Sequence, residues 1–181
     1  MKILIYGFKS YKHWKKDVTS KILRKIPKKT NIVKVILPIK FEKKPILDKI
    51  RKHKPDLIIG IGQHSRGRKV KIERIAKNIK KVNRKAEETM ISKKGSKSMT
   101  LNLKIDSGGE SWTSYDAGNG ICNYSMYVVS SNAKGSKFVF FNFPKKYDPK
   151  RAAEIINRRI EIFESELKTV IAQKSLNSYF T

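Results

Sequence analysis

The sequence predicts a layered α/β domain built on a parallel sheet. Within residues 1–62, three apolar runs of strand length alternate with two segments of helical periodicity, an order typical of parallel sheets. A chain of 181 residues is long enough for one domain, and at this size about 70% of the unfolded surface is buried. An apolar content of 39% excludes a disordered polycation.

The opening half supplies the strand–helix alternation. Residues 2–6 are a short apolar run closed by a glycine, as in a buried strand. Residues 17–26 place their apolar side chains at helical spacing and stop at a proline. Residues 32–37 form a second strand, and residues 45–53 open with a proline, which favours a first helical turn. Residues 57–62 are a third buried strand with glycines at its end.

The middle of the chain is less regular. Residues 77–100 are polar and rich in lysine, which indicates a mobile excursion or a hairpin, and we treat residues 79–110 as a variable excursion from the domain. Residues 100–105 alternate in polarity and predict one of its strands. Residues 111–115 predict another strand.

The last third returns to the α/β pattern. Residues 121–131 predict a helix, and the very apolar residues 137–143 predict the last strand. A long amphipathic helix follows from residue 148 or 149 to about residue 173. The domain is therefore expected to span residues 1–173, with a loosely held tail over residues 174–181.

The amino-acid content excludes several classes of protein. Cys122 is the single cysteine, so neither an internal disulfide framework nor a cysteine-rich zinc site is expected. Three histidines leave little for metal binding, and we expect no cofactor. No apolar run reaches about 18 residues, so no membrane helix is expected. The N-terminus has the pattern of a strand and not of a leader, which favours a cytoplasmic protein.

Positive charge is concentrated in the first half. Residues 1–98 hold 31 Lys and Arg against 7 Asp and Glu, whereas residues 99–181 hold 11 against 8. Glutamate does not rise with lysine, so the excess does not indicate the ion-pair networks of thermophiles. It indicates a polyanionic partner, RNA in particular, with a merely solvated lysine-rich face as the alternative.

The candidate RNA-binding residues are cations with aromatic side chains nearby in sequence, Tyr11 and Trp14. Such a mixture suits stacking and phosphate contact. The chain has no signature of an RRM, KH or zinc-finger domain, so the signal is compositional. These cations are Lys12, Lys15, Lys16, Arg66, Arg68, Lys69, Lys80, Lys81, Arg84 and Lys85.

Cys122 follows a glycine-rich loop and opens the predicted helix over residues 121–131. A helix N-terminus favours the thiolate, which is the nucleophilic form of cysteine. The alternative is an inert, buried cysteine that serves only for packing. Because ligands of parallel sheets bind beyond the carboxyl ends of the strands, we expect the site near Gly7, Phe8 and residues 63–68.

Three segments of the chain match the motifs of one known family. Residues 7–11 are similar to the motif G-F-E-P-F. Residues 55–78 are similar to P-D … G-Q … I-E-R-x-A-x-N. Residues 117–127 are similar to A-G-x-Y-x-C-N, and residues 141–144 follow as a counterpart of F-x-H-x-P. With these motifs the chain resembles the pyroglutamyl peptidase I (pyrrolidone-carboxylate peptidase) family of cysteine peptidases.

The resemblance implies a three-layer α/β/α fold with a mostly parallel sheet, self-association, and removal of N-terminal pyroglutamate from peptides. Cys122 matches the nucleophile of a Cys-His-Glu triad, and Glu73 matches the carboxylate that orients the histidine. Phe8 and Tyr11 match aromatics that hold the pyroglutamyl ring. Gln63 matches a position whose backbone helps to bind the lactam.

The histidine of the triad falls on Asn142. Asparagine has no titratable nitrogen, so it can neither take a proton from Cys122 nor give one to the leaving amine. It can still donate a hydrogen bond to Glu73. His64 is the one histidine that the predicted sheet edge brings near the site, and it is a candidate substitute base. Two hypotheses follow: an impaired or rewired peptidase, or a silent homologue that binds RNA, for instance on the ribosome.

Overall fold

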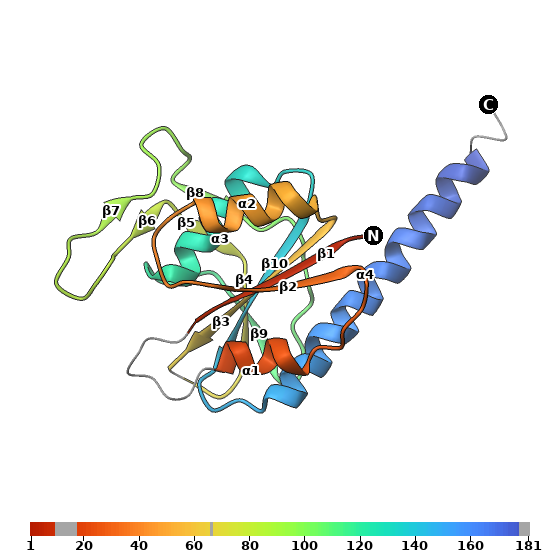
Figure 1. Cartoon of the computed structure of the whole chain (residues 1–181), viewed down its shortest axis with the longest axis horizontal. Coiled ribbons are helices and arrows are strands. Elements are labelled where there is room, and N and C mark those ends of the chain that lie inside the picture. Colours follow the sequence, from red (N-terminus) through yellow and green to blue (C-terminus); the bar gives the residue numbers. More distant parts are fainter. Residues whose placement is uncertain (10–17, 66, 178–181) are drawn as a thin grey trace.

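The computed structural model describes residues 1–9, 18–65 and 67–177. A six-stranded sheet in the order β2-β1-β3-β10-β4-β9 forms its centre (Figure 1). Strands β2, β1, β3 and β10 are parallel to one another, while β4 and β9 run in the opposite direction. The sheet strands are β1 (Ile3–Phe8), β2 (Ile32–Leu37), β3 (Leu57–His64), β4 (Val70–Glu73), β9 (Ser111–Ser114) and β10 (Lys137–Pro144).

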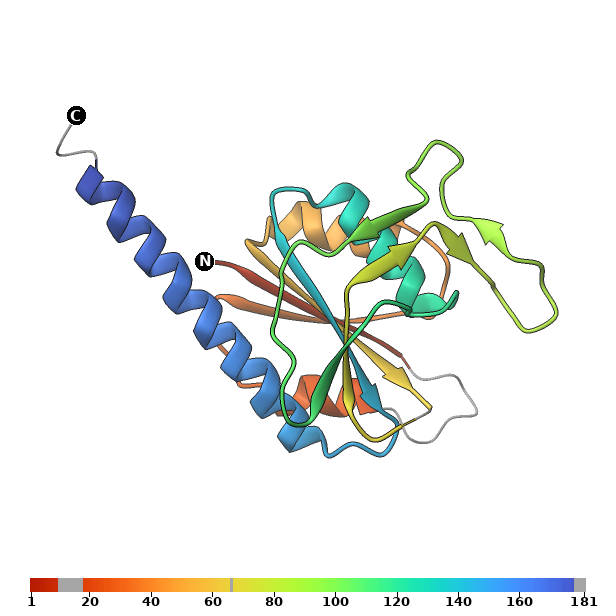
Figure 2. The same ribbon diagram turned by 180° about the vertical axis from the view of Figure 1, so that it is seen from behind.

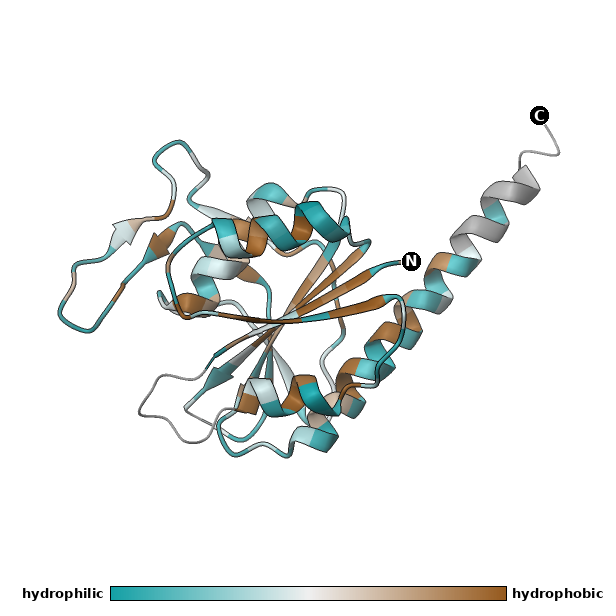
Figure 3. Ribbon diagram, in the orientation of Figure 1, coloured by the Kyte–Doolittle hydropathy of each residue, from teal (hydrophilic) through white to brown (hydrophobic). Residues whose placement is uncertain are grey.

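Helices cover both faces of the sheet, which confirms the three-layer α/β/α architecture. One apolar cluster packs α1 (Val18–Lys25) and α4 (Pro149–Asn177) against one face. A second cluster packs α2 (Lys44–His53) and α3 (Ile121–Asn132) against the other. Figure 3 shows the brown, apolar strands enclosed between these helices, as expected for strands buried on both faces.

Two strands are longer than the sequence predicts. β1 does not end at Gly7 but continues through Phe8. Gly7 lies under α1, where a Cβ would be 3.2 Å from Cβ of Thr19, so a glycine suits this close approach. Likewise β3 includes Gln63 and His64, which we expected in a loop, because β10 runs on to Pro144 and keeps pairing with them.

The strand predicted over residues 100–105 is mostly wrong. Only β8 (Ser98–Thr100) is a strand there, paired with β5 (Ile75–Lys77). Leu101 and Ile105 are buried, although neither residue belongs to a strand. Their burial explains the alternation of apolar and polar residues in this segment. Strand β4 was not predicted at all, although its residues alternate between apolar and charged.

The lysine-rich excursion is a hairpin that projects from the body. Its two short strands are β6 (Ile79–Lys80) and β7 (Thr89–Met90), and Figure 1 shows it at the end of the molecule opposite the free end of α4. Helix α4 continues to Asn177, past the expected end near residue 173 and into the residues that we assigned to the tail. No helix in the described part of the chain is long and apolar enough to cross a bilayer.

Candidate active site

One row of residues crosses the sheet beside the expected site. Gly62 pairs with Asn142, and Asn142 pairs on its other side with Lys71. Lys71 pairs in turn with Trp112 on the edge strand β9. Because paired residues point to the same face of a sheet, this row lies on one face, and the cysteine helix α3 covers its middle.

Cys122 is the second residue of α3, which begins after Gly120. Its thiol lies over Gly62, because a Cβ at that glycine would be 2.7 Å from Sγ and 2.2 Å from Oδ1 of Asn142. Cys122 and Asn142 therefore border the same small space, and a side chain at position 62 would fill it. The backbone N–H of Gln63 donates a hydrogen bond to the sulfur.

Asn142 and Glu73 form the other half of the site. Nδ2 of Asn142 donates to Oε1 of Glu73 at 2.8 Å, the pairing that we expected from the sequence. Glu73 is 1% exposed and Asn142 is 4% exposed. Among the described residues, Oε2 of Glu73 and Oδ1 of Asn142 have no hydrogen-bond partner. The amide is thus held by the carboxylate with its oxygen directed toward the space beside Cys122.

The surroundings of Cys122 favour the neutral thiol. Burial raises the pKa of Cys122 from its ordinary value of 9.0 to about 12, and the nearby negative charge of Glu73 acts in the same direction. The hydrogen bond from Gln63 opposes this rise without cancelling it. The direction of this shift is opposite to the thiolate that we expect at a helix N-terminus.

His64 does not reach Cys122 through any hydrogen bond of the described residues. It lies on β3, and its Nε2 is 3.1 Å from the carbonyl oxygen of Lys69. Its buried Nδ1 has no partner there. In the described part of the chain, no group of three His, Cys, Asp or Glu side chains could hold a metal ion.

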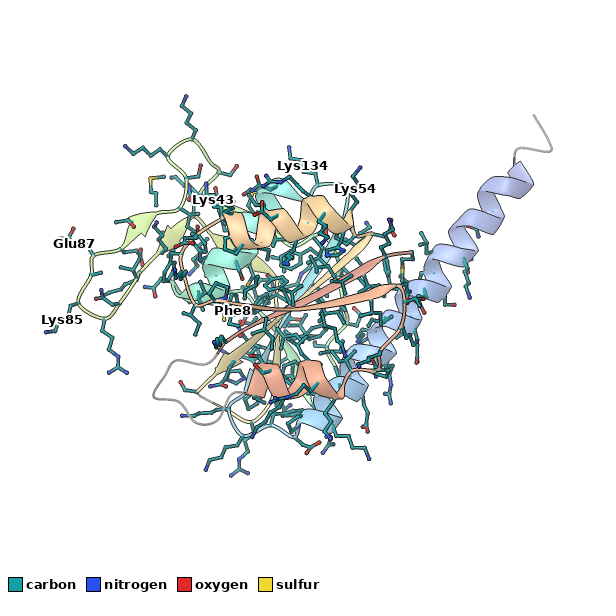
Figure 4. All side chains as sticks on the ribbon, viewed as in Figure 1. Phe8, Lys43, Lys54, Lys85, Glu87 and Lys134 are labelled. Carbon is teal, nitrogen blue, oxygen red and sulfur yellow. The ribbon has the colours of Figure 1, made fainter. Side chains whose placement is uncertain are left out.

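Phe8 lies on the same face as the cysteine, at the far side of Gly62 from Asn142. It is 7% exposed and meets the ring of Tyr6 edge-on, with centroids 5.9 Å apart. Figure 4 labels Phe8 beneath α2 and α3. Between Phe8 and Tyr124 the described chain leaves a cavity of about 10 Å³, room for one water molecule.

The other residues matched by the family motifs are placed differently. The side chain of Gln63 accepts a weak hydrogen bond of 3.5 Å from the N–H of Val18, at the start of α1. Its backbone N–H faces the sulfur of Cys122, as described above. Tyr11 lies outside the described residues.

The candidate RNA-binding cations fall into two described groups. Arg68 and Lys69 are exposed in the turn between β3 and β4. Lys80, Lys81, Arg84 and Lys85 lie on the β6–β7 hairpin, where Figure 4 shows Lys85 pointing away from the body. Nζ of Lys80 is 5.9 Å from the ring centroid of Tyr124. Lys12, Lys15, Lys16 and Arg66 lie outside the described residues.

Two residues beside the site are not among the residues that the sequence predicts for the cysteine site. Lys71 and Trp112 continue the row from Asn142 to the sheet edge, and only the register of β4 and β9 reveals this. The alternation of Val70 and Ile72 with Lys71 and Glu73 could have predicted β4 as a strand. Nothing in the sequence indicates that Trp112 lies two strands from Asn142.

The assembled groups are a thiol, an amide and a carboxylate. The carboxylate orients the amide and the amide lies beside the thiol, which is the arrangement of a nucleophile, a middle group and an orienting acid. The middle group does not titrate. The site therefore has the geometry of a cysteine triad, but its middle position has no base for proton transfer.

Comparisons with known proteins identify relatives of this chain. Residues 1–143 match the family described as pyroglutamyl peptidase. The pyrrolidone-carboxylate peptidase of Saccharolobus islandicus (strain L.S.2.15 / Lassen #1) is 27% identical over 154 residues, which cover 74% of each chain. Pyrrolidone-carboxylate peptidase 2 of Saccharolobus solfataricus has the same identity and coverage.

Solved structures share the fold. A mutant pyrrolidone carboxyl peptidase from Pyrococcus furiosus superposes with a TM-score of 0.78 at 21% identity, covering 92% of this chain and 100% of that one. Pyroglutamyl peptidase I from Bacillus amyloliquefaciens gives a TM-score of 0.71 at 23% identity, with coverage of 83% and 82%.

Proposed function

Because the chain belongs to the pyroglutamyl peptidase family, we propose that it carries the family's cysteine site in a hydrolytically impaired form. The observation that carries this proposal is the hydrogen bond from Nδ2 of Asn142 to Glu73. An asparagine occupies the place of the base and is oriented by the carboxylate that would orient a histidine. The family match supports a peptide with an N-terminal pyroglutamyl residue as the substrate class.

Hydrolysis of an amide by cysteine needs two proton transfers. The thiol must lose its proton to attack the carbonyl carbon, and the leaving amine must gain one before the C–N bond breaks. Asn142 performs neither transfer, and burial of Cys122 holds its thiol neutral. Loss of one member of such a triad typically costs about a thousandfold or more in turnover.

In an alternative form of this proposal the site is rewired and His64 acts as the base. We favour this form less because of the contacts that His64 makes. The imidazole is on the correct face of the sheet, but its described hydrogen bond is with Lys69. A base must come within about 3.2 Å of the proton that it takes. His64 would have to leave Lys69 and turn toward Cys122 to act.

The thiol titration tests this proposal. We expect Cys122 to remain a thiol through neutral pH, with its pKa raised to about 12. The absorbance difference at 240 nm between the wild type and Cys122→Ser reports the thiolate, since this chain has one cysteine. No step is expected below pH 9. A step centred below about pH 8 would mean that a base lies beside the sulfur, and would overturn the proposal.

The same shift has a consequence for stability. The pKa of Cys122 is higher in the folded chain than in the unfolded one, so its neutral form favours folding. This contribution is fully present below pH 9 and is lost as the pH rises toward 12. We therefore expect the difference in free energy of unfolding between the wild type and Cys122→Ala, measured by chemical unfolding, to be constant below pH 9 and to change as the pH rises toward 12.

A second function, binding of RNA, is favoured by the positions of the described cations. The exposed Arg68 and Lys69 and the hairpin cations project from the body and are not neutralised by described ion pairs. The net charge of +27 attracts a polyanion over long range. This function is independent of Cys122 and can coexist with an inactive peptidase site.

A further inference from the structure

Trp112 is unusually exposed for a tryptophan. It lies on the edge strand β9 and is 46% exposed, whereas tryptophan side chains are mostly buried. Nζ of Lys71 lies over its ring at 5.5 Å from the centroid. A cation at this distance stabilises the indole at the surface and leaves part of its face open. Strand β9 and its neighbour β4 can be followed by their colours in Figure 2.

The Lys71–Trp112 pair adjoins the cysteine site. Lys71 is the direct cross-strand neighbour of Asn142, and Trp112 is the next residue in the row. Strand spacing places the backbone of Trp112 about 10 Å from that of Asn142. The pair therefore forms the side of the site opposite Phe8.

The surroundings of the pair are cationic. Arg68 and Lys69 are exposed in the turn that leads into β4. Asp116 is the acidic neighbour, but it pairs with Lys77 at 3.0 Å. Lys77 and, more weakly, Lys71 lower the pKa of Asp116, so several positive charges act on one carboxylate. An anion would meet the open side of the indole with cations around it.

An open indole among cations suits an aromatic anion. Nucleobases stack on tryptophan without sequence preference, and the lysine and arginine side chains neutralise the phosphates on either side. An acidic peptide with one aromatic residue offers an aromatic ring flanked by negative charges only once along its chain. A nucleic acid repeats them at every nucleotide and so matches the net charge of +27 as well.

We propose that Lys71 and Trp112 form a platform on which single-stranded RNA stacks a base at the mouth of the cysteine site, with Arg68 and Lys69 contacting the adjoining phosphates. This proposal rests on the proposed RNA binding, and it adds where the RNA binds and which contacts hold it. It requires no reaction at Cys122. Occupation of the platform would place a nucleotide beside Lys71, which is the cross-strand neighbour of Asn142.

Tryptophan fluorescence tests the platform directly. Trp14 is the other tryptophan of the chain, so Trp14→Phe assigns the signal to Trp112. A twelve-nucleotide oligoadenylate should quench this emission at low salt and lose its effect at high salt. Trp112→Ala should weaken binding about tenfold or more, and Trp112→Phe should restore part of that loss. Arg68→Ala and Lys69→Ala, which each remove one proposed phosphate contact, should each reduce the slope of log affinity against log salt by about one.

Two matched variants serve as controls. Tyr115→Ala removes an aromatic side chain that is 66% exposed and lies just after β9. Lys134→Ala removes one positive charge on the C-terminal side of α3, where Figure 4 labels it. Both should bind the oligoadenylate within about twofold of the wild type, since removal of an isolated rim contact changes affinity little.

Three outcomes would overturn the platform, and they differ in what else they overturn. If the wild type binds RNA and Trp112→Ala binds it equally well, the platform is wrong and RNA binding stands. If the wild type binds no oligoadenylate at low salt, both proposals fall. If a pyroglutamyl peptide quenches Trp112 and RNA does not, the pair is a peptide subsite instead.

Discussion

Replacing Asn142 by histidine is expected to raise the turnover of a pyroglutamyl amide by about a thousandfold or more over the wild type. Glu73 already holds the side chain at position 142 through a hydrogen bond of 2.8 Å. That side chain and the sulfur of Cys122 both lie over Gly62, where a Cβ would clash with each of them. A histidine there would take the thiol proton and return it to the leaving amine. Steady-state release of a chromogenic amine measures the gain.

Two controls separate a restored triad from other causes. Asn142→Gln keeps an amide at position 142, so it should stay as inactive as the wild type. Asn142→His combined with Cys122→Ala should lose the whole gain, because the new base would have no nucleophile to activate. A folded Asn142→His variant with no gain would show that more than the base is missing from this site.

The affinity for a single-stranded oligoribonucleotide is expected to fall about a thousandfold or more between 50 and 200 mM salt. This is the fall for a protein that neutralises about seven or more phosphates of a single strand, because each contact releases counterions. The large excess of cations in residues 1–98 provides for that number of contacts. Fluorescence anisotropy over a salt series measures the slope.

The cations of the β6–β7 hairpin should account for part of the slope of log affinity against log salt. Lys81, Arg84 and Lys85 together replaced by alanine should reduce it by about three. The matched control replaces Lys150, Arg158 and Lys168, which are exposed on α4 and lie outside the hairpin. That control removes the same charge but should leave the slope unchanged. Equal losses in both variants would mean that net charge alone drives binding.

The sheet strands with strong apolar runs were predictable, and the site residues followed from the family motifs. Burial on both faces leaves β1, β3 and β10 with continuous apolar runs. Strand β4 escaped prediction because it is short and its Lys71 and Glu73 face the site instead of the core. The polarity of its own residues is a poor predictor of such a strand, because β4 forms by pairing with β10, which is distant in the sequence.

The chemistry of Cys122 could not be predicted from its position in the sequence. A glycine-rich loop before a helix correctly placed the cysteine at the start of α3. Its protonation state depends on what surrounds the sulfur, namely the tight packing over Gly62 and the charge of Glu73. Those neighbours come from β3 and β4, and no local pattern reports them. The pair of Glu73 with Asn142 was predictable because both positions match family motifs.

Hydrolysis of a pyroglutamyl amide by the wild type and by Cys122→Ala, measured side by side at neutral pH, tests the central claim most directly. The claim is that the triad geometry is kept while proton transfer is lost. It predicts that the two proteins release amine at the same background rate. A rate in the wild type that depends on Cys122 and approaches that of the Pyrococcus furiosus peptidase in the same assay would contradict it.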